Sequence, residues 1–199
     1  MRVTKQTQRV HRAAILEQAG RMFRRDGLAG AGVADITAAA GLTHGAFYGH
    51  FPSKDALAAE SCRESLVVAA KKWRDRADRA RARGDDPHTT LINQNLTERH
   101  RDAPEEGCAL PSLGGELVRA KPELRAALDA GVTALAAVLE DEIVRADPDR
   151  PRAGCARASL AMLAAMCGGL LLARTLSHDP ERSQAALRSA AELARRAAG

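Results

Sequence analysis

Side chains that can donate hydrogen bonds are concentrated in one short stretch of the sequence. They belong to Thr43, His44, Tyr48 and His50. Phe47 and Phe51 lie among them, four residues apart, and this spacing predicts one buried face of a short helix. Because so short a helix adds little apolar core, we interpret it as a docking element that presents polar groups to a partner.

The residues before this stretch predict a second helix that crosses the first. Ile36 and Ala40 are four residues apart, and Gly41 follows where a helix end needs a residue that tolerates positive φ. Thr43 then occupies a capping position for the next helix. Two helices separated by so few residues must cross steeply, so residues 33–57 are predicted to form a helix-turn-helix.

The composition favours an all-helical protein, and its charge is unevenly distributed. Hydrophobic residues make up 45% of the 199 residues but aromatic residues only 3%, which suits closely packed helices better than strands. Residues 1–54 hold eight basic and three acidic residues, whereas residues 55–199 hold 22 of each kind. The net charge of +5 therefore lies with the helix-turn-helix and favours a polyanion as its partner.

Caps and breaks predict the remaining elements. Residues 1–8 are expected to form a mobile arm, followed by an amphipathic helix over 9–26 that Gly27 ends. Ser53 is expected to cap a long helix that runs to about residue 83. Further helices are predicted at 88–101, 108–120 (interrupted by Pro111 and a glycine pair), 122–146, 151–177 and 179–196.

Cysteine usage and hydropathy predict a cytoplasmic protein. The four cysteines have neither CxxC nor Cys/His ligand spacing, so we expect reduced thiols, no metal and no cofactor. The N-terminus lacks the apolar segment of a signal peptide. The longest apolar run, residues 160–173, is shorter than the roughly 20 residues that span a bilayer, so no membrane partner is expected.

The helix-turn-helix stretch also resembles a known family. The residues that carry the resemblance are Ile36, Ala40-Gly41-Leu42, Phe47-Tyr48, His50-Phe51, Lys54 and Leu57. They resemble the DNA-binding segment of TetR-family (TetR/AcrR-type) transcriptional repressors. The resemblance implies an all-helical chain of about nine helices, with a three-helix DNA-binding domain at 1–54 and an effector-binding and dimerisation domain at 55–199. It also implies a homodimer that leaves double-stranded operator DNA when a small-molecule effector binds.

The resemblance assigns DNA contacts to residues whose chemistry agrees with that role. These residues are Thr43, His44, Gly45, Tyr48, Gly49, His50 and Lys54. Hydroxyl and imidazole donors suit phosphate oxygens, and the ammonium lies at a helix start that already favours an anion. The two glycines allow close approach to the major groove, where His44 could read a base edge.

Two residues depart from the family pattern. Gly32 replaces the usual Ser or Thr cap of the first motif helix, so a hydroxyl contact to phosphate is missing there. Thr37 replaces a small alanine, which leaves either a tighter helix crossing or a hydroxyl bonded back to its own helix.

The residues behind the helix-turn-helix suggest an effector cavity between the long helix and the later helices. Its candidate lining residues are Trp73, Asn95, His100, Cys108, Met162 and Met166. Trp73 is the one aromatic residue outside the front domain, so we do not expect a flat cation held in an aromatic cage.

Small residues predict a dimer interface in the last two long helices. Ala161, Ala164 and Gly168 let helix backbones approach closely, so with the final helix and a second copy they would form a four-helix bundle. Alternatives remain open: a regulator that responds to oxidation or alkylation of Cys108, an activator, or a helical partner-binding protein. An enzyme is disfavoured because no catalytic triad, metal-ligand or phosphate-loop pattern is present in the sequence.

Overall fold

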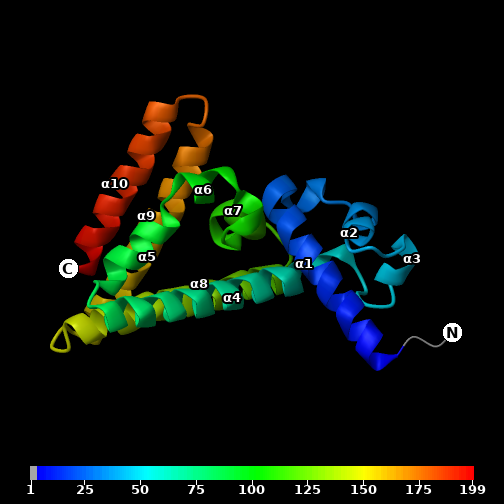
Figure 1. Ribbon diagram of the computed structural model, residues 1–199, viewed down its shortest axis with the longest axis horizontal. Coiled ribbons are helices and arrows are strands. Elements are labelled where there is room, and N and C mark those ends of the chain that lie inside the picture. The colour runs from blue at the N-terminus through cyan, green and yellow to red at the C-terminus, as the bar shows by residue number, and fades with distance from the viewer. Residues whose placement is uncertain (1–3) are drawn as a thin grey trace. The chain divides into compact units, whose positions relative to one another are not determined.

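The computed structural model describes residues 4–199, and in this part of the chain helices are joined by turns and loops, with no strand (Figure 1). The all-helical prediction is therefore confirmed. Ten α-helices and one short 3-10 helix follow one another in the described range. They are α1 (Lys5–Gly30), α2 (Val33–Ala39), α3 (His44–Phe47), α4 (Lys54–Arg83), α5 (Pro87–Asn95), α6 (Glu98–Asp102), η1 (Pro104–Glu106), α7 (Ala109–Leu117), α8 (Pro122–Ala146), α9 (Arg152–Thr175) and α10 (Pro180–Ala198).

The helices form two compact units. Unit 1 contains the described part of Met1–Ser65 together with Pro104–Ala130, and unit 2 contains Leu66–Ala103 and Gly131–Gly199. Helices α4 and α8 contribute residues to both units. The division at residue 54 into a DNA-binding and an effector domain is a functional one, and it stays a prediction.

In unit 1, α1 packs against α2, α7 and η1. The core consists of large apolar side chains that are almost completely buried: Ile15, Phe23, Ile36, Phe47, Phe51 and Leu57. Two contacts tie α1 to the distant 104–130 segment. Arg24 donates to the carbonyl oxygen of Glu105, with Nη2–O at 2.6 Å, and the Leu28 N–H donates to Glu116 Oε2 at 2.9 Å.

Helix α1 begins earlier than the sequence predicts. Residues 5–8 are helical, so the expected arm is wrong over that range, while residues 1–3 lie outside the described chain. The physical reason is a cap: Thr4 Oγ1 accepts a hydrogen bond from the Thr7 N–H at 3.1 Å. Gly27 breaks the helix as predicted, with φ 78° and ψ 170°, and one short turn follows it.

In unit 2, α9 and α10 form an antiparallel pair, to which α5 packs through α10 and α6 through α9 (Figure 1). The buried carboxylate of Glu142 on α8 accepts hydrogen bonds from Arg81 on α4 at 2.5 Å and from Arg145 at 2.6 Å. Asp86 and Asp179 cap α5 and α10 as predicted, each with proline at the start of the helix.

Two predicted helices have different limits. The helix expected at 88–101 is two helices, because the chain leaves helical geometry at Leu96 and Thr97 Oγ1 caps α6 by accepting from the His100 N–H. The helix expected to break at Pro111 is continuous over Ala109–Leu117. Pro111 lies in its first turn, where a missing N–H leaves no helical hydrogen bond unmade.

Helix α9 is longer than its uninterrupted apolar run. Its 24 residues and a window with mean hydropathy 1.7 are sufficient, by length and composition alone, to cross a membrane. Half of that window is buried inside the protein, and a core helix of a soluble protein has the same length and composition. The sequence analysis argued against a membrane span from residues 160–173 alone, and this run is shorter than the helix that contains it.

Candidate nucleic-acid interface and effector region

Gly41 forms the turn between α2 and α3. Its φ is +72°, and the end of α2 is closed by two backbone hydrogen bonds, Leu42 N–H to Thr37 O and Gly41 N–H to Ala38 O, each 2.9 Å. This is the Schellman arrangement, in which a left-handed residue satisfies two carbonyls at a helix end. A side chain at residue 41 would be strained, so the glycine predicted to stop the helix is required by the turn.

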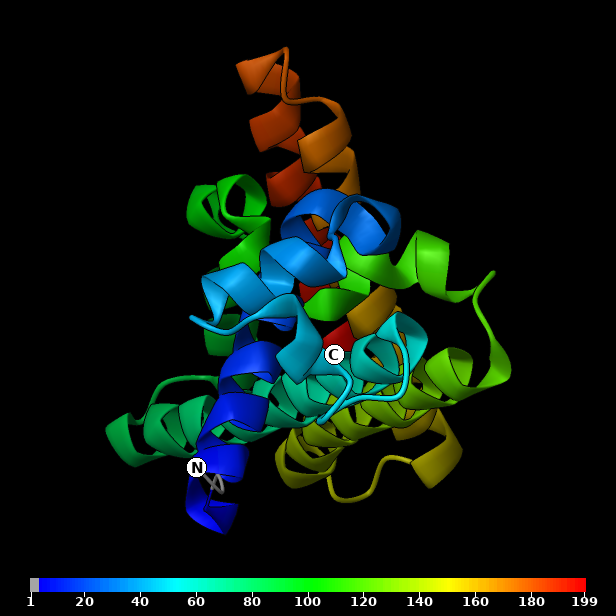
Figure 2. The ribbon, with the colours of Figure 1, turned by 90° about the vertical axis from the view of Figure 1, so that its right-hand side faces the viewer.

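Helix α3 is held by its aromatic side and exposes its polar side. Phe47 and Phe51 are buried, with ring centroids 5.9 Å apart, whereas Tyr48 is 63% exposed and meets the Phe47 ring edge-on at 5.1 Å. His44 lies 5.8 Å from Tyr48, measured between ring centroids. In Figure 2, α2 and α3 face the viewer. The fixed Phe47 therefore positions two exposed donors side by side.

Thr43, Gly45 and Gly49 are exposed at the same helix. Thr43 occupies the N-cap position, but its hydroxyl makes no capping hydrogen bond, so that part of the prediction is wrong. A Cβ added at Gly45 would meet nothing within 4 Å, and one at Gly49 would lie 3.4 Å from the carbonyl oxygen of Ala46. The fold itself does not require glycine at residue 45, and this leaves close approach of a partner as its physical rationale.

We expect Gly45→Ala to separate folding from docking. The added methyl has free space, and alanine is a better helix former by up to about 1 kcal/mol, so the melting temperature should not fall. If the backbone approaches the major groove here, the methyl should weaken DNA binding about tenfold or more. Thermal unfolding and fluorescence anisotropy with labelled DNA would measure both effects, and unchanged DNA affinity would contradict close approach at this residue.

His50 and Lys54 lie on either side of the start of α4. The His50 ring centroid is 6.2 Å from that of His11 on α1, and burial, followed by the charges of His11 and Arg12, lowers the pKa of His50. The imidazole can still donate one hydrogen bond when neutral. Lys54 Nζ lies 3.5 Å from the carbonyl oxygen of Ala29, and Ser53 Oγ caps α4 as predicted, accepting from the Ala56 N–H at 3.1 Å.

The basic excess of residues 1–54 is partly neutralised by ion pairs. Arg12 forms an ion pair with Glu60 and lies 4.7 Å over the Phe51 ring, and Arg25 forms an ion pair with Asp26 at 2.8 Å. Lys5 and Arg9, by contrast, are exposed on the first turns of α1. Lys5 was not identified as a site candidate because the sequence placed residues 1–8 in an arm, and Arg9, the first residue of the predicted helix, was not identified either. The signal that could have found Lys5 is the Thr4 cap.

The two departures from the family pattern have local explanations. Gly32 caps α2 without a side-chain hydrogen bond, and a Cβ there would lie 2.7 Å from Asp35 Oδ2. The buried Thr37 hydroxyl lies 2.9 Å from the carbonyl oxygen of Val33 and 3.0 Å from that of Ala34, so it is bonded back to its own helix.

In unit 2, three of the predicted effector residues form one hydrogen-bond chain. Trp73 Nε1 donates to Asn95 Oδ1 at 3.2 Å, and Asn95 Nδ2 donates to the carbonyl oxygen of Leu91 at 2.8 Å. His100 Nδ1 lies 2.7 Å from the carbonyl oxygen of Asn95. Residues from α4, α5 and α6 are thereby brought together, although 27 positions separate the first from the last.

The other predicted effector residues are on α9 and at the start of α7. Met162 and Met166 are buried on the face of α9 that continues to Leu170, where the side chain packs against Leu96. Cys108 belongs to unit 1, at the N-cap of α7, and is partly exposed. The structure thus joins Trp73, Asn95 and His100 by direct contacts, places Met162 and Met166 in the core along α9, and places Cys108 in unit 1.

His100 should make the stability of the protein depend on pH. Burial, ahead of the nearby charges of Arg174 and Arg76, lowers the pKa of His100 below its ordinary 6.5. The unfolded chain therefore binds the proton first on acidification, so stability held above about pH 6.5 is lost as the pH falls. Urea unfolding between pH 7.5 and 5.5 should show a smaller acid loss for His100→Asn than for the wild type; equal losses would contradict this.

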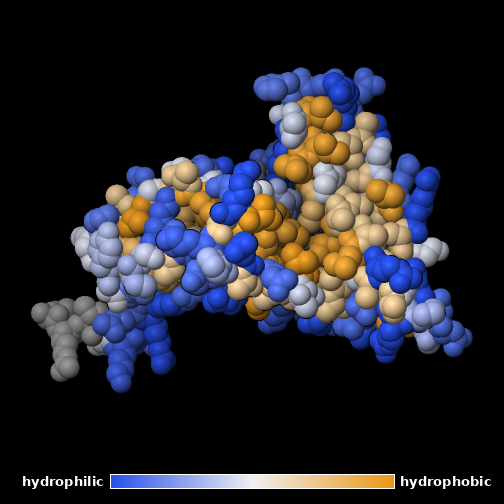
Figure 3. Space-filling model, turned by 180° about the vertical axis from the view of Figure 1, so that it is seen from behind, coloured by the Kyte–Doolittle hydropathy of each residue, from blue (hydrophilic) through white to orange (hydrophobic). Residues whose placement is uncertain are grey.

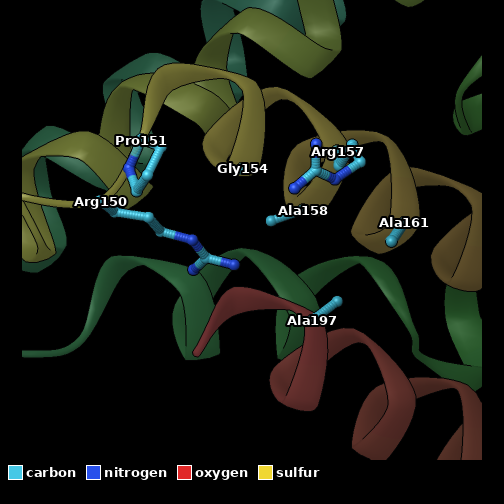
Figure 4. Close-up of a pocket in the computed structure, with 7 residues that line it drawn as sticks. All are labelled: Arg150, Pro151, Gly154, Arg157, Ala158, Ala161 and Ala197. Atoms are coloured by element: carbon cyan, nitrogen blue, oxygen red, sulfur yellow. The ribbon is translucent and has the colours of Figure 1, made fainter.

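One surface concavity lies between the start of α9 and the end of α10 (Figure 4). Its volume is about 440 Å³, and it is lined by Arg150, Pro151, Gly154, Arg157, Ala158, Ala161 and Ala197. Arg150 Nη1 donates to the carbonyl oxygen of Ala198 at 2.8 Å, which ties the two helix ends together. None of the predicted effector residues lines this concavity.

Comparisons with known proteins agree with the helix-turn-helix geometry. A family model for bacterial regulatory proteins of the tetR family matches residues 15–60, which include α2, α3 and the start of α4. The comparison with curated proteins found no match.

Solved structures of similar fold cover nearly the whole chain. A TetR transcriptional regulator from Chloroflexus aurantiacus is 26% identical with a TM-score of 0.72, over 94% of this chain and 95% of that one. A TetR-family regulator from Cytophaga hutchinsonii is 21% identical, TM-score 0.72, over 98% and 97%. The reduced form of NemR from Escherichia coli is 18% identical, TM-score 0.74, over 92% and 97%.

Proposed function

Because the chain is a TetR-family transcriptional regulator that binds DNA, we propose that it is a repressor, which leaves its operator when a small-molecule effector binds. The observation that carries the proposal is α3, a short helix fixed by buried Phe47 and exposing Tyr48 and His44 beside two glycines. Thr43, Tyr48, His50 and Lys54 are proposed to contact phosphates, and His44, Gly45 and Gly49 to face the major groove.

We further propose that the repressor is a homodimer formed through α9 and α10. One side of α9 exposes apolar and small residues at helical spacing: Leu160, Ala161, Ala164, Leu171 and Leu172. Leu193 of α10 is also exposed, at 59%. Figure 3 shows apolar residues gathered over this part of unit 2. An apolar helix face of this kind favours burial against the same face of a second copy.

A dimer gives the effector a way to control DNA binding. Two copies of α3 must reach half-sites about one helical turn apart, roughly 34–36 Å. An effector that binds one arrangement of the dimer better than another shifts the population away from the spacing that fits DNA. The proposed action is regulatory, takes place in the cytoplasm, and includes no catalytic step.

A salt titration of DNA binding tests this function. DNA selected from a random pool by the wild-type protein should be a palindrome, and log affinity should fall steeply and linearly with log salt concentration. Lys54→Gln should make the slope of log affinity against log salt concentration shallower by about one. Replacement of the ion-paired Arg25 by Gln should leave this slope unchanged. Absence of DNA binding at low salt would refute the proposal. Transcription from the selected site distinguishes repression from activation.

Regulation through Cys108 is a second candidate, favoured by an electropositive setting. The charge of Arg24 acts on Cys108, which also lies at the N-terminus of α7. Both features favour the thiolate, which is the reactive form. The Cys62 thiol is buried, and that burial, followed by the influence of Cys108, raises its pKa to about 11.

N-Ethylmaleimide provides the test for Cys108. Its thiolate would add to the maleimide double bond, and mass spectrometry would locate the adduct. The modified protein should lose operator affinity, while Cys108→Ser should keep its affinity after the same treatment. Full modification of Cys108 without a change in DNA affinity would end this candidate.

A further inference from the structure

Arg76 on α4 is a half-buried guanidinium without a partner. Within residues 4–199 it makes no hydrogen bond or ion pair, whereas Arg81 and Arg101 in the same unit pair with Glu142 and Asp102. Burial, followed by repulsion from Arg79, lowers the pKa of Arg76. A cation partly removed from water without a counter-charge is unfavourable, so an anion from outside the chain would stabilise Arg76 here.

Arg76 lies next to the hydrogen-bond chain of the effector region, although it makes none of its hydrogen bonds. It is three residues after Trp73, on the adjacent turn of α4, and Trp73 is bonded through Asn95 to His100. Arg174 of α9 approaches from another side and donates to the carbonyl oxygens of His100 at 2.7 Å and Arg101 at 3.1 Å. Four elements of unit 2 therefore bring their polar side chains to one place.

Three positive charges are linked at this place. The charges of Arg174 and Arg76 act on His100, and the charge of Arg79 acts on Arg76. Two acidic side chains of the same unit already pair with other arginines: Glu142 accepts from Arg81 and Arg145, and Asp102 pairs with Arg101.

Resting on the proposed effector release, we propose that the effector is an anion, a small molecule with a carboxylate or phosphate group bound by Arg76 beside Trp73. A guanidinium presents a planar fork of donors that fits either oxyanion, and the buried indole of Trp73 is an apolar neighbour for the rest of the molecule. The same charges repel a cationic effector. The single tryptophan of the chain adjoins the site and reports on it.

The experiment uses ligands matched in shape and different in charge. Two series of ligands are used, one with an octyl chain and one with a phenylpropyl chain. Within each series the compounds differ only in the head group, which is a carboxylate, a phosphate, a primary amide or an ammonium. Binding is followed by Trp73 fluorescence, and release is followed by anisotropy of the selected operator DNA with the full-length protein. At least one anion should bind roughly ten- to a hundredfold more tightly than its amide and should release DNA.

Variants assign the charge preference to Arg76. Arg76→Gln should remove the preference for the anion, and Arg76→Lys should retain part of it. Arg83→Gln, an exposed arginine at the end of the same helix that pairs with Asp85, should leave it unchanged. Equal binding of the carboxylate and phosphate forms would show that charge alone is recognised, and a difference would identify which oxyanion the site prefers.

The outcomes separate this inference from the proposed function. Release of DNA by an amide or ammonium compound as efficiently as by an anion, or unchanged anion binding in Arg76→Gln, would overturn the anionic effector while leaving effector release intact. Anion binding without release would also overturn it. A wild-type protein that does not bind DNA would refute the proposed function itself.

Discussion

Gly169→Ala should lower the melting temperature of the protein by about 10 °C. A Cβ at residue 169 on α9 would lie 2.2 Å from the Cβ of Ala190 on α10. Both atoms are attached directly to backbone, so the two helices must separate to admit the methyl. Overpacking of this kind costs about 3 kcal/mol, which corresponds to roughly 6–12 °C in a chain of this length.

The neighbouring glycine is the matched control. A Cβ at Gly168 would meet nothing within 4 Å, and alanine is favoured in a helix by up to about 1 kcal/mol. Gly168→Ala should therefore keep or raise the melting temperature. Thermal and urea unfolding of both variants measure the contrast. Equal effects of the two substitutions would show that α9 and α10 do not pack as closely as described.

Leu171→Asp should convert the proposed dimer into a monomer. Leu171 is 56% exposed on α9, so aspartate costs little in the single chain but would be buried without a partner in the four-helix bundle. A monomer binds one half-site at a time, so it loses the additional affinity that comes from binding two linked half-sites together. Operator affinity should then fall by about a hundredfold or more.

Val118→Asp controls for the loss of an exposed apolar side chain. Val118 is 61% exposed, and it lies at the end of α7 in unit 1, outside the proposed interface. This variant should remain dimeric and keep its DNA affinity. Analytical ultracentrifugation and anisotropy with the selected operator would measure both variants. A dimeric Leu171→Asp protein would place the interface elsewhere.

Most helix limits were predictable because local interactions set them. Asp86 and Asp179 cap α5 and α10 next to proline, and Ser53 caps α4, as their sequence positions indicate. The errors also have local causes. The cap at Thr4 extends α1 by four residues, and the cap at Thr97 divides the helix predicted at 88–101. Both are threonines, which the periodicity of apolar residues does not register.

The candidate site was predictable only in part. The spacing of Phe47 and Phe51 indicated which side of α3 is buried, and so which side exposes Tyr48. The charge count could not distinguish exposed cations from paired ones, because the partner of Arg12 is Glu60, 48 positions away. Exposed Lys5 was missed for a related reason, since an arm has no defined face.

The sequence by itself determined that the chain is helical, where most helices begin and end, and that residues 33–57 form a helix-turn-helix. These properties depend on residues within a few positions of one another, and sequence spacing records such contacts directly. Gly41 is one example, since its positive φ follows from the turn it must make.

Tertiary structure decided which side chains meet across the fold. It distinguished Gly169 from Gly168 by the presence of Ala190 on a different helix. It also joined Trp73, Asn95 and His100 and left the nearby Arg76 without a counter-charge among residues 4–199. Such contacts link residues tens of positions apart, and one chain's local pattern does not encode which distant helix faces will pack together.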